Sequence, residues 1–220
     1  MQEVGRFVDA VLLARDFLTN NPQLIKIPVS VNPEITKIII ETTPFKEIKI
    51  LETLTGVSKI AGILLLTKPE DSSKNLLTDK EAIPTILLSP TSTKCWKRFA
   101  VCKELMHMYI EQDRKELEKR ARRFDGKCII SNLRHISEEF WAVNKEDELN
   151  AEQFGFVVSM EILLPWARRI DLDATKKEGL SNYQIANKFK VPESVIARYF
   201  DSGYRELSSE SNEGLDASRR

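Results

Sequence analysis

The spacing of apolar residues changes along the chain, and each change predicts an element boundary. Residues 3–19 carry apolar side chains at helical spacing, and Asn20-Asn21-Pro22 follows them with residue types that stop helices. Asn32-Pro33-Glu34 has the composition of a helix start, with proline at the first helical position. We therefore expect an N-terminal helix, a connection, and a short second helix that extends through Ile40.

Three apolar runs in the next part of the chain have the composition of strands. Residues 45–51 alternate between apolar and polar, residues 60–66 are apolar and rich in β-formers, and residues 84–88 form the third run. Strands that follow one another before a long helix are typical of α+β proteins. The pattern predicts an α+β fold with a small mixed sheet packed on helices.

Helical spacing returns after the third strand. Residues 92–112 are apolar on nearly every side, which is typical of a buried helix. Residues 114–123 are highly charged and fit a solvent-facing helix, and residues 126–130 break the pattern. A further long helix is predicted over 147–164, where Pro165 ends it.

The last part of the chain has the rhythm of a helix–turn–helix. Apolar residues within 180–204 fall where two short helices would bury them between each other. We expect four parts in all: an N-terminal helix and linker over 1–31, a main domain over 32–170, a helical hairpin packed on it over 171–205, and a disordered tail over 206–220.

Charge and composition limit the choice of partner and compartment. The 220 residues contain 33 basic and 33 acidic side chains, so the net charge of zero gives no general attraction to nucleic acid or anionic membranes. No apolar run approaches the roughly 18 residues of a membrane span, and the first residues lack the pattern of a signal peptide. Three cysteines without a C-x-x-C pair indicate a reducing cytoplasm.

The helix over 92–112 contains the most specific chemical pattern. Lys103-Glu104-Leu105-Met106-His107 has the spacing of the H-E-x-x-H zinc helix, with lysine at the first histidine position. A lysine ammonium has donors and no lone pair, so it cannot bind zinc while it is protonated. Because the chain has only two histidines, a full ligand set would need His107, His135 and a carboxylate, with Glu104 as general base.

The same stretch resembles a family signature. Residues Arg98–His107 are similar to the R-F-T-x-A-H-E-L-G-H motif of the ImmA/IrrE metallopeptidases. Residues Ala151–Gly155 and Glu161–Pro165 resemble the two halves of that family's E-A-x-x-F-A-x-x-L-L-M-P helix, and Gln184–Pro192 resembles its closing I-A-x-x-F-x-V-S segment. The resemblance implies a zincin-like fold and, for active members, cleavage of helix–turn–helix repressors that control phage, mobile-element or stress genes.

The departures from the family pattern concern the metal. Lys103 replaces the first histidine ligand, and Met106 replaces the glycine. The family's third ligand, a glutamate, would fall at Asn150 in one register and at Phe154 in another. Glu152 lies nearby but falls in neither register, so the comparison predicts that one ligand is lost and a second is displaced.

Three hypotheses follow. The first is a pseudo-metallopeptidase without a cofactor, in which Lys103 replaces the ion, pairs with Glu152 or Glu148 of the facing helix, and acts by regulatory binding. Its partner would be a protein, possibly a helix–turn–helix repressor, and Arg98 is a candidate binding residue within the signature.

The second hypothesis is an active zinc endopeptidase with a rebuilt ligand set of His107, His135 and Glu152, and with Glu104 as general base. The third is a DNA-binding protein that uses residues 180–204. Arg198 is the single base-reading side chain that its second helix would offer, so a packed hairpin is favoured and direct DNA binding is not expected.

Overall fold

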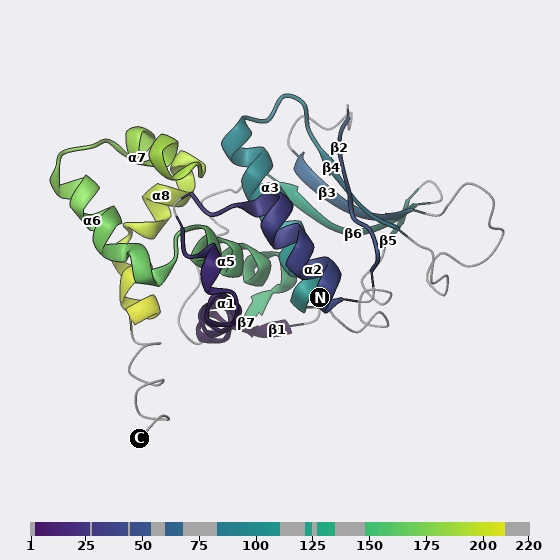
Figure 1. Cartoon of the computed structure of the whole chain (residues 1–220), viewed down its shortest axis with the longest axis horizontal. Helices are drawn as coiled ribbons and strands as arrows, with labels where there is room; N and C mark the ends of the chain where they lie inside the picture. Colours follow the sequence, from purple (N-terminus) through teal and green to yellow (C-terminus); the bar gives the residue numbers. More distant parts are fainter. Residues whose placement is uncertain are drawn as a thin grey trace, which may run out of the picture. The chain divides into compact units, whose positions relative to one another are not determined.

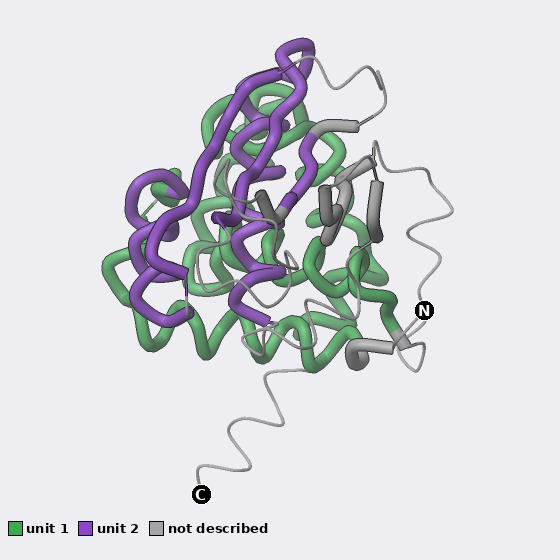
Figure 2. The backbone as a smooth tube through the Cα atoms, turned by 90° about the vertical axis from the view of Figure 1, so that its right-hand side faces the viewer, with its two compact units in different colours: residues 1–30, 137–220 green, residues 31–136 purple. Residues whose placement is uncertain are grey.

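The computed structural model describes residues 3–26, 28–43, 45–53, 60–67, 83–110, 122–124, 127–134 and 148–209. Contacts divide the chain into two compact units, shown in two colours in Figure 2. Unit 1 contains residues 1–30 and 137–220, and unit 2 contains residues 31–136. Helices and strands occur in both units, so the expected α+β class is confirmed.

Unit 2 is built on a five-stranded sheet with the strand order β2-β4-β3-β6-β5 (Figure 1). The strands are β2 (Lys49–Glu52), β3 (Ile60–Thr67), β4 (Ile83–Leu88), β5 (Arg122–Phe124) and β6 (Lys127–Arg134). Strand β2 runs parallel to β4, and the other neighbours are antiparallel. The sheet is therefore mixed, as the sequence predicts.

Helix α3 (Lys94–Ile110) packs against β3, β4 and β6, and also contacts η2 (Val31–Ile35) and α2 (Thr36–Thr42). Glycine at position 62 lets β3 approach the helix closely, because a Cβ there would lie 2.9 Å from the Cβ of Ala100. Leu64, Ile86 and Phe99 are fully buried in this layer. The sheet thus fixes the helix that carries the zinc-like motif.

Unit 1 joins segments from both ends of the sequence. Strand β1 (Glu3–Arg6) pairs antiparallel with β7 (Glu148–Asn150), and α1 (Phe7–Asn20) packs on α5 (Ala151–Leu163). The remaining elements are η1 (Pro22–Leu24), η4 (Trp166–Arg168), α6 (Arg169–Lys177), α7 (Asn182–Phe189), α8 (Glu193–Tyr199) and a terminal helix over 202–209.

Helix α5 begins where its N-terminal hydrogen bonds are satisfied. Asn150 is the N-cap, and its side chain accepts from the backbone N–H of Gln153, whose own side chain accepts from the backbone N–H of Asn150. This reciprocal capping box satisfies two backbone donors at the start of the helix. The capping box marks the boundary between strand β7 and helix α5, in a stretch where the sequence predicts a single helix.

Several predicted boundaries differ from the structure because strands pair over long sequence distances. The helices predicted over 3–19 and 147–164 begin only at Phe7 and Ala151, since 3–6 and 148–150 pair with each other. The predicted break at 126–130 contains the start of β6, and residues 122–123, placed in the charged helix, belong to β5.

The two units do not coincide with the predicted ranges 32–170 and 171–205. Helix α5 belongs to unit 1 with α1, whereas α3 belongs to unit 2. The terminal helix extends through residue 209 and Ser208 is fully buried, so residues 206–209 are ordered, unlike the disordered tail predicted over 206–220. Residues 210–220 lie outside the described residues.

Candidate functional site

The zinc-like motif lies entirely inside the protein. Residues 99–108 of α3 are all buried, and Lys103, Glu104 and His107 are 0%, 0% and 2% exposed. A lysine and a glutamate are almost never fully buried unless they are paired. The motif is therefore a set of interior polar groups, which need partners within the protein.

Lys103 and Glu104 form an ion pair within this interior. The distance between Lys103 Nζ and Glu104 Oε1 is 3.3 Å. Transfer of either charge alone into a low-dielectric interior would cost several kcal/mol, and the pair offsets part of this cost. The ammonium thus lies beside the carboxylate that would serve as general base in a zinc peptidase.

This donor set does not fit a zinc ion. Lys103 and His107 are four residues apart and share a helix face, as the two histidines of a zinc helix do, but the ammonium offers donors instead of a lone pair. Among the residues that the structure describes, no group of three or more His, Cys, Asp or Glu side chains could hold a metal ion.

The other predicted ligands and partners are distributed over the chain. Glu152 is a residue of α5 in unit 1, whereas His107 belongs to unit 2. His135 lies outside the described residues, as does the side chain of Glu148. The predicted pairing of Lys103 with Glu152 or Glu148, and the ligand set of His107, His135 and Glu152, stay predictions.

Arg98, the candidate binding residue, is half-buried near the start of α3. Burial lowers the pKa of its guanidinium, and the neighbouring thiols of Cys102 and Cys95 offset part of that shift. These cysteines lie four residues after and three residues before Arg98, hence on the same helix face. Its role in binding is a prediction that the structure does not test.

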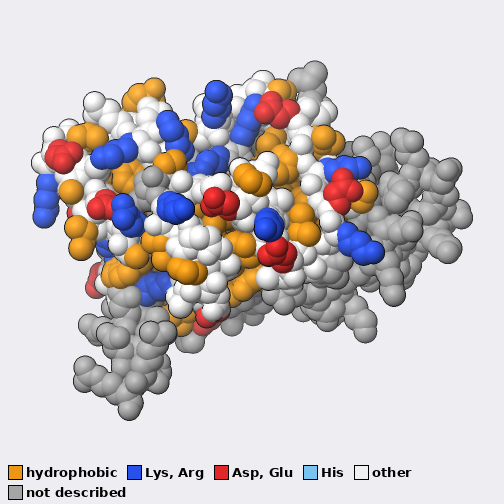
Figure 3. All heavy atoms as spheres, viewed as in Figure 1, with side chains coloured by type: hydrophobic (Ala, Val, Ile, Leu, Met, Phe, Trp, Pro, Cys, Tyr) orange, Lys and Arg blue, Asp and Glu red, His pale blue; other side chains and the backbone are white. Residues whose placement is uncertain are grey.

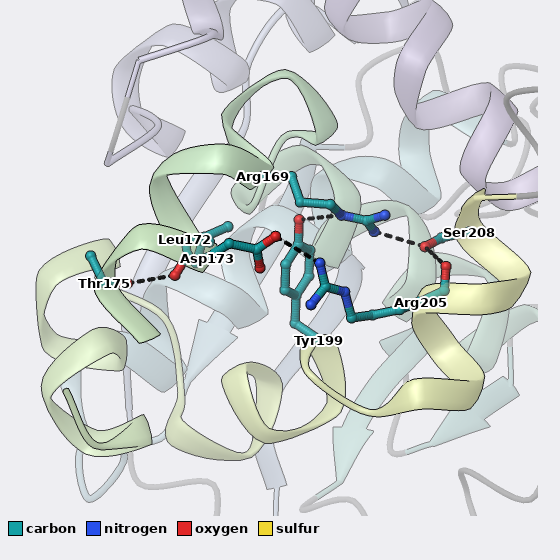
Figure 4. Close-up of polar contacts among 7 residues, drawn as sticks. All are labelled: Arg169, Leu172, Asp173, Thr175, Tyr199, Arg205 and Ser208. Carbon is teal, nitrogen blue, oxygen red and sulfur yellow. Dashed lines mark hydrogen bonds and ion pairs between the residues drawn. The ribbon is translucent and has the colours of Figure 1, made fainter. Parts of the chain in front are cut away.

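A second polar cluster, which the sequence did not predict, lies in unit 1 (Figure 4). Arg169 donates from Nε to Tyr199 Oη at 3.0 Å and from Nη2 to Ser208 Oγ at 2.8 Å. Arg15 donates from Nη2 to the backbone carbonyl of Ser208 at 2.8 Å. The cluster joins α1, α6, α8 and the terminal helix.

The buried acid of this cluster is Glu161 on α5, which accepts a hydrogen bond from Tyr204 Oη at 2.6 Å. Burial raises the pKa of Glu161, and the Tyr204 hydrogen bond, Arg15 and Arg169 offset part of that rise. Burial also raises the pKa of Tyr199 to about 12. It raises the pKa of Tyr204 well above 10, and the neighbouring Glu161 carboxylate adds to this shift.

The Trp166 ring lies beside both guanidinium groups. The Cζ atoms of Arg169 and Arg15 are 3.5 Å and 4.7 Å from its centroid. The sequence contained one signal for this cluster, because Glu161 is a lone acid in the apolar run of α5. An acid at such a position is buried only with partners.

The predicted hairpin is present as α7 and α8. Ser181 and Gln184 form a capping box at the start of α7, and Lys190 takes the left-handed conformation between the helices, with φ 57° and ψ 43°. Arg198, the one predicted base reader, pairs with Asp201 at 3.4 Å. On the face shown in Figure 3, basic and acidic side chains are interspersed.

Comparison with known proteins found no matching protein family, curated protein or solved structure. Among the described helices, none combines the length and the apolar character needed to cross a membrane.

Proposed function

We propose that this chain is an ImmA/IrrE-like regulatory protein with a zincin-like fold that has lost zinc peptidase activity and acts by binding a protein partner. The class of partner that the resemblance implies is a helix–turn–helix repressor in phage, mobile-element or stress-response control. The setting that the cysteine pattern favours is the cytoplasm.

The observation that carries this proposal is the buried pair of Lys103 and Glu104. An ammonium 3.3 Å from the carboxylate puts one positive charge beside the general-base position. Lys103 supports the loss of the metal in two ways, because it replaces a histidine ligand and because its positive charge repels a divalent cation. A mixed sheet against which the motif helix packs supports the zincin-like fold.

The experiment compares zinc content in the purified wild-type chain and in Lys103→His, which recreates H-E-x-x-H. The proposal expects no stoichiometric zinc in the wild type. Zinc that Lys103→His gains and His107→Ala removes would identify Lys103 as the residue that excludes the ion. Stoichiometric zinc in the wild type that His107→Ala removes would instead support the active endopeptidase. Lys103→Gln is the control, because it removes the charge without adding an imidazole.

Regulatory binding is tested separately with a purified helix–turn–helix repressor and the full chain. The proposal expects a stable complex in which the repressor stays intact. Cleavage of the repressor that a metal chelator abolishes would contradict the proposed loss of peptidase activity. DNA binding through residues 180–204 is not proposed, because Arg198 is already paired with Asp201. A salt-dependent shift of labelled DNA would contradict this choice.

A further inference from the structure

The terminal helix over 202–209 buries little apolar surface on unit 1. Tyr204 and Ser208 are its fully buried residues, and Leu207 is half-buried. Tyr204 is the one large side chain among the fully buried two, and its ring lies edge-on to Phe7 with 5.3 Å between the centroids. A segment with few buried apolar contacts opens at a lower free energy than the core on which it packs.

Polar contacts join this helix to α1, α5 and α6, and those of Arg169 and Arg205 are visible in Figure 4. The contacts are Tyr204 Oη to Glu161 Oε1 at 2.6 Å, Arg205 Nη2 to Asp173 Oδ2 at 2.8 Å, Arg169 Nη2 to Ser208 Oγ at 2.8 Å, and Arg15 Nη2 to the Ser208 carbonyl at 2.8 Å. Isolated helices shorter than about 12–15 residues are marginal in water, so this short segment is helical only while it is docked.

The contact with Glu161 differs from the others because its acceptor is a carboxyl group in the core. Glu161 is 1% exposed, and its second oxygen, Oε2, has no hydrogen-bond partner among the described residues. A carboxylate in this position lacks the water that stabilises its charge, so burial favours the neutral acid and raises the pKa of Glu161. Because the Tyr204 phenol lies directly against Oε1, undocking of the helix uncovers the carboxyl.

Several helices present charged or titratable groups to Glu161. The Tyr204 hydrogen bond, Arg15 of α1 and Arg169 of α6 favour the carboxylate, and they offset part of the effect of burial on its pKa. Burial raises the pKa of Tyr199 of α8 to about 12 and that of Tyr204 well above 10. Both phenols therefore keep their protons at neutral pH, which leaves the carboxyl of Glu161 as the acid on which pH acts.

We propose that the terminal helix over 202–209 is a proton-linked latch of unit 1, which is docked while Glu161 is neutral and opens when the carboxyl releases its proton. The docked state holds this one proton on Glu161, and the open state releases it to water while the rest of unit 1 stays folded. The latch is a property of unit 1 and does not depend on the proposed loss of zinc from unit 2.

Hydrogen–deuterium exchange of the full chain measures the opening. Peptides that cover 202–209 and α5 are followed from pH 5 to pH 9, and their rates are corrected for the pH dependence of intrinsic amide exchange. We expect residues 202–209 to open at a lower free energy than α5. Their open fraction should rise by up to about tenfold per pH unit above the ordinary pKa of about 4.5 and level off beyond the raised, docked pKa, because opening releases one proton.

The matched control is Glu161→Gln, whose amide oxygen still accepts from Tyr204 but cannot titrate. In this variant the open fraction of residues 202–209 should not change with pH. Arg205→Gln removes the ion pair with Asp173 and leaves Glu161 in place. It should raise the open fraction by the same factor at every pH and keep the wild-type slope.

Equal protection of residues 202–209 and α5 overturns the proposal, because the helix then opens only together with the unit. A wild-type open fraction that stays constant or falls with pH relative to Glu161→Gln also overturns it. If Glu161→Gln does not fold, carbon-13 NMR of the wild-type Glu161 carboxyl decides. Its titration midpoint should lie above 4.5 and coincide with the levelling of the opening curve, and a midpoint at the ordinary value overturns the latch.

Discussion

Lys103 and Glu104 are neighbours in sequence, and each is the other's partner in the core of unit 2. Their side chains are 1% and 0% exposed, so water cannot replace either partner. A buried ion pair of this kind is weak evidence for added stability, but loss of one member leaves the other charge uncompensated. We therefore expect that removing one charge of the pair destabilises the protein more than removing both.

Lys103→Met should lower the free energy of unfolding by about 3–5 kcal/mol, because it leaves the Glu104 carboxylate buried. The double variant Lys103→Met/Glu104→Gln should recover a large part of that loss, since it removes both charges of the ion pair. Urea unfolding of the wild type, both single variants and the double variant measures the coupling. A Lys103→Met loss below about 1 kcal/mol would contradict a buried, charged pair.

The raised pKa of Glu161 predicts that its contribution to folding stability decreases as the pH rises, whereas most acids give the opposite trend. Its folded pKa is raised, so the folded state binds more protons than the unfolded state between the two pKa values. The contribution of Glu161 to stability is thus fully present below the unfolded value of about 4.5 and is lost as the pH rises through the folded pKa. Wild type should lose stability relative to Glu161→Gln across this window.

Unfolding free energies of the two proteins, measured from pH 4 upward, test this sign. In Glu161→Gln the amide oxygen still accepts from Tyr204, so the variant removes the titration while it keeps the hydrogen bond. A wild type that gains stability relative to Glu161→Gln as the pH rises would show that the carboxylate is the favoured form.

At the scale of elements, α3 depends on how closely β3 approaches it. A Cβ added at Gly62 would lie 2.9 Å from Ala100 Cβ, a separation that real Cβ atoms do not adopt. The neighbour is a short side chain on a buried helix, so it cannot move away as a flexible side chain would. The sheet and the helix must therefore separate if position 62 gains a side chain.

Gly62→Ala should lower the free energy of unfolding by about 1–3 kcal/mol, the usual cost of overpacking a core. Gly203→Ala is the control, because its Cβ would meet only the Asp201 carboxylate at 3.3 Å at an exposed position. Thermal or urea unfolding compares the two. Equal effects at both positions would mean that the contact with Ala100 does not limit the approach of β3.

The local spacing of apolar residues predicts most helices and strands, whereas the other strands form only by pairing with segments far away in the sequence. The helix around the zinc-like motif and strands β3 and β4 follow the apolar spacing. Strands β1 and β7 pair across more than a hundred residues, so no local window contains both. The polar cluster around Arg169 was missed for the same reason.

At the scale of the whole molecule, the two buried polar clusters belong to different units. Lys103 and Glu104 lie in unit 2, and Glu161, Tyr204 and their neighbours lie in unit 1. Each cluster draws its contacts described above from residues of its own unit. The structure therefore favours independent responses to mutation in the two clusters.

Lys103→Met and Tyr204→Phe should have additive effects on the free energy of unfolding, within about 0.3–0.5 kcal/mol, because the ion pair of Lys103 and the hydrogen bond of Tyr204 described above involve different residues of different units. Chemical unfolding of the two single variants and the double variant measures the sum. The pair Tyr204→Phe and Glu161→Leu is the positive control, since each of these variants removes one partner of the same hydrogen bond. A coupling between Lys103 and Tyr204 as large as in this control would show that the units are not independent.

The composition of unit 1 from residues 1–30 and 137–220 has a consequence for synthesis on the ribosome. Helix α1 emerges early, but its partner α5 emerges only after all of residues 31–136. Domains fold as units during synthesis, so unit 2 can be complete while the apolar face of α1 is still without α5. We therefore expect the nascent chain to expose Phe7, Val11 and Phe17 while more than a hundred residues are translated, and exposed apolar surface of this kind is what chaperones protect during synthesis.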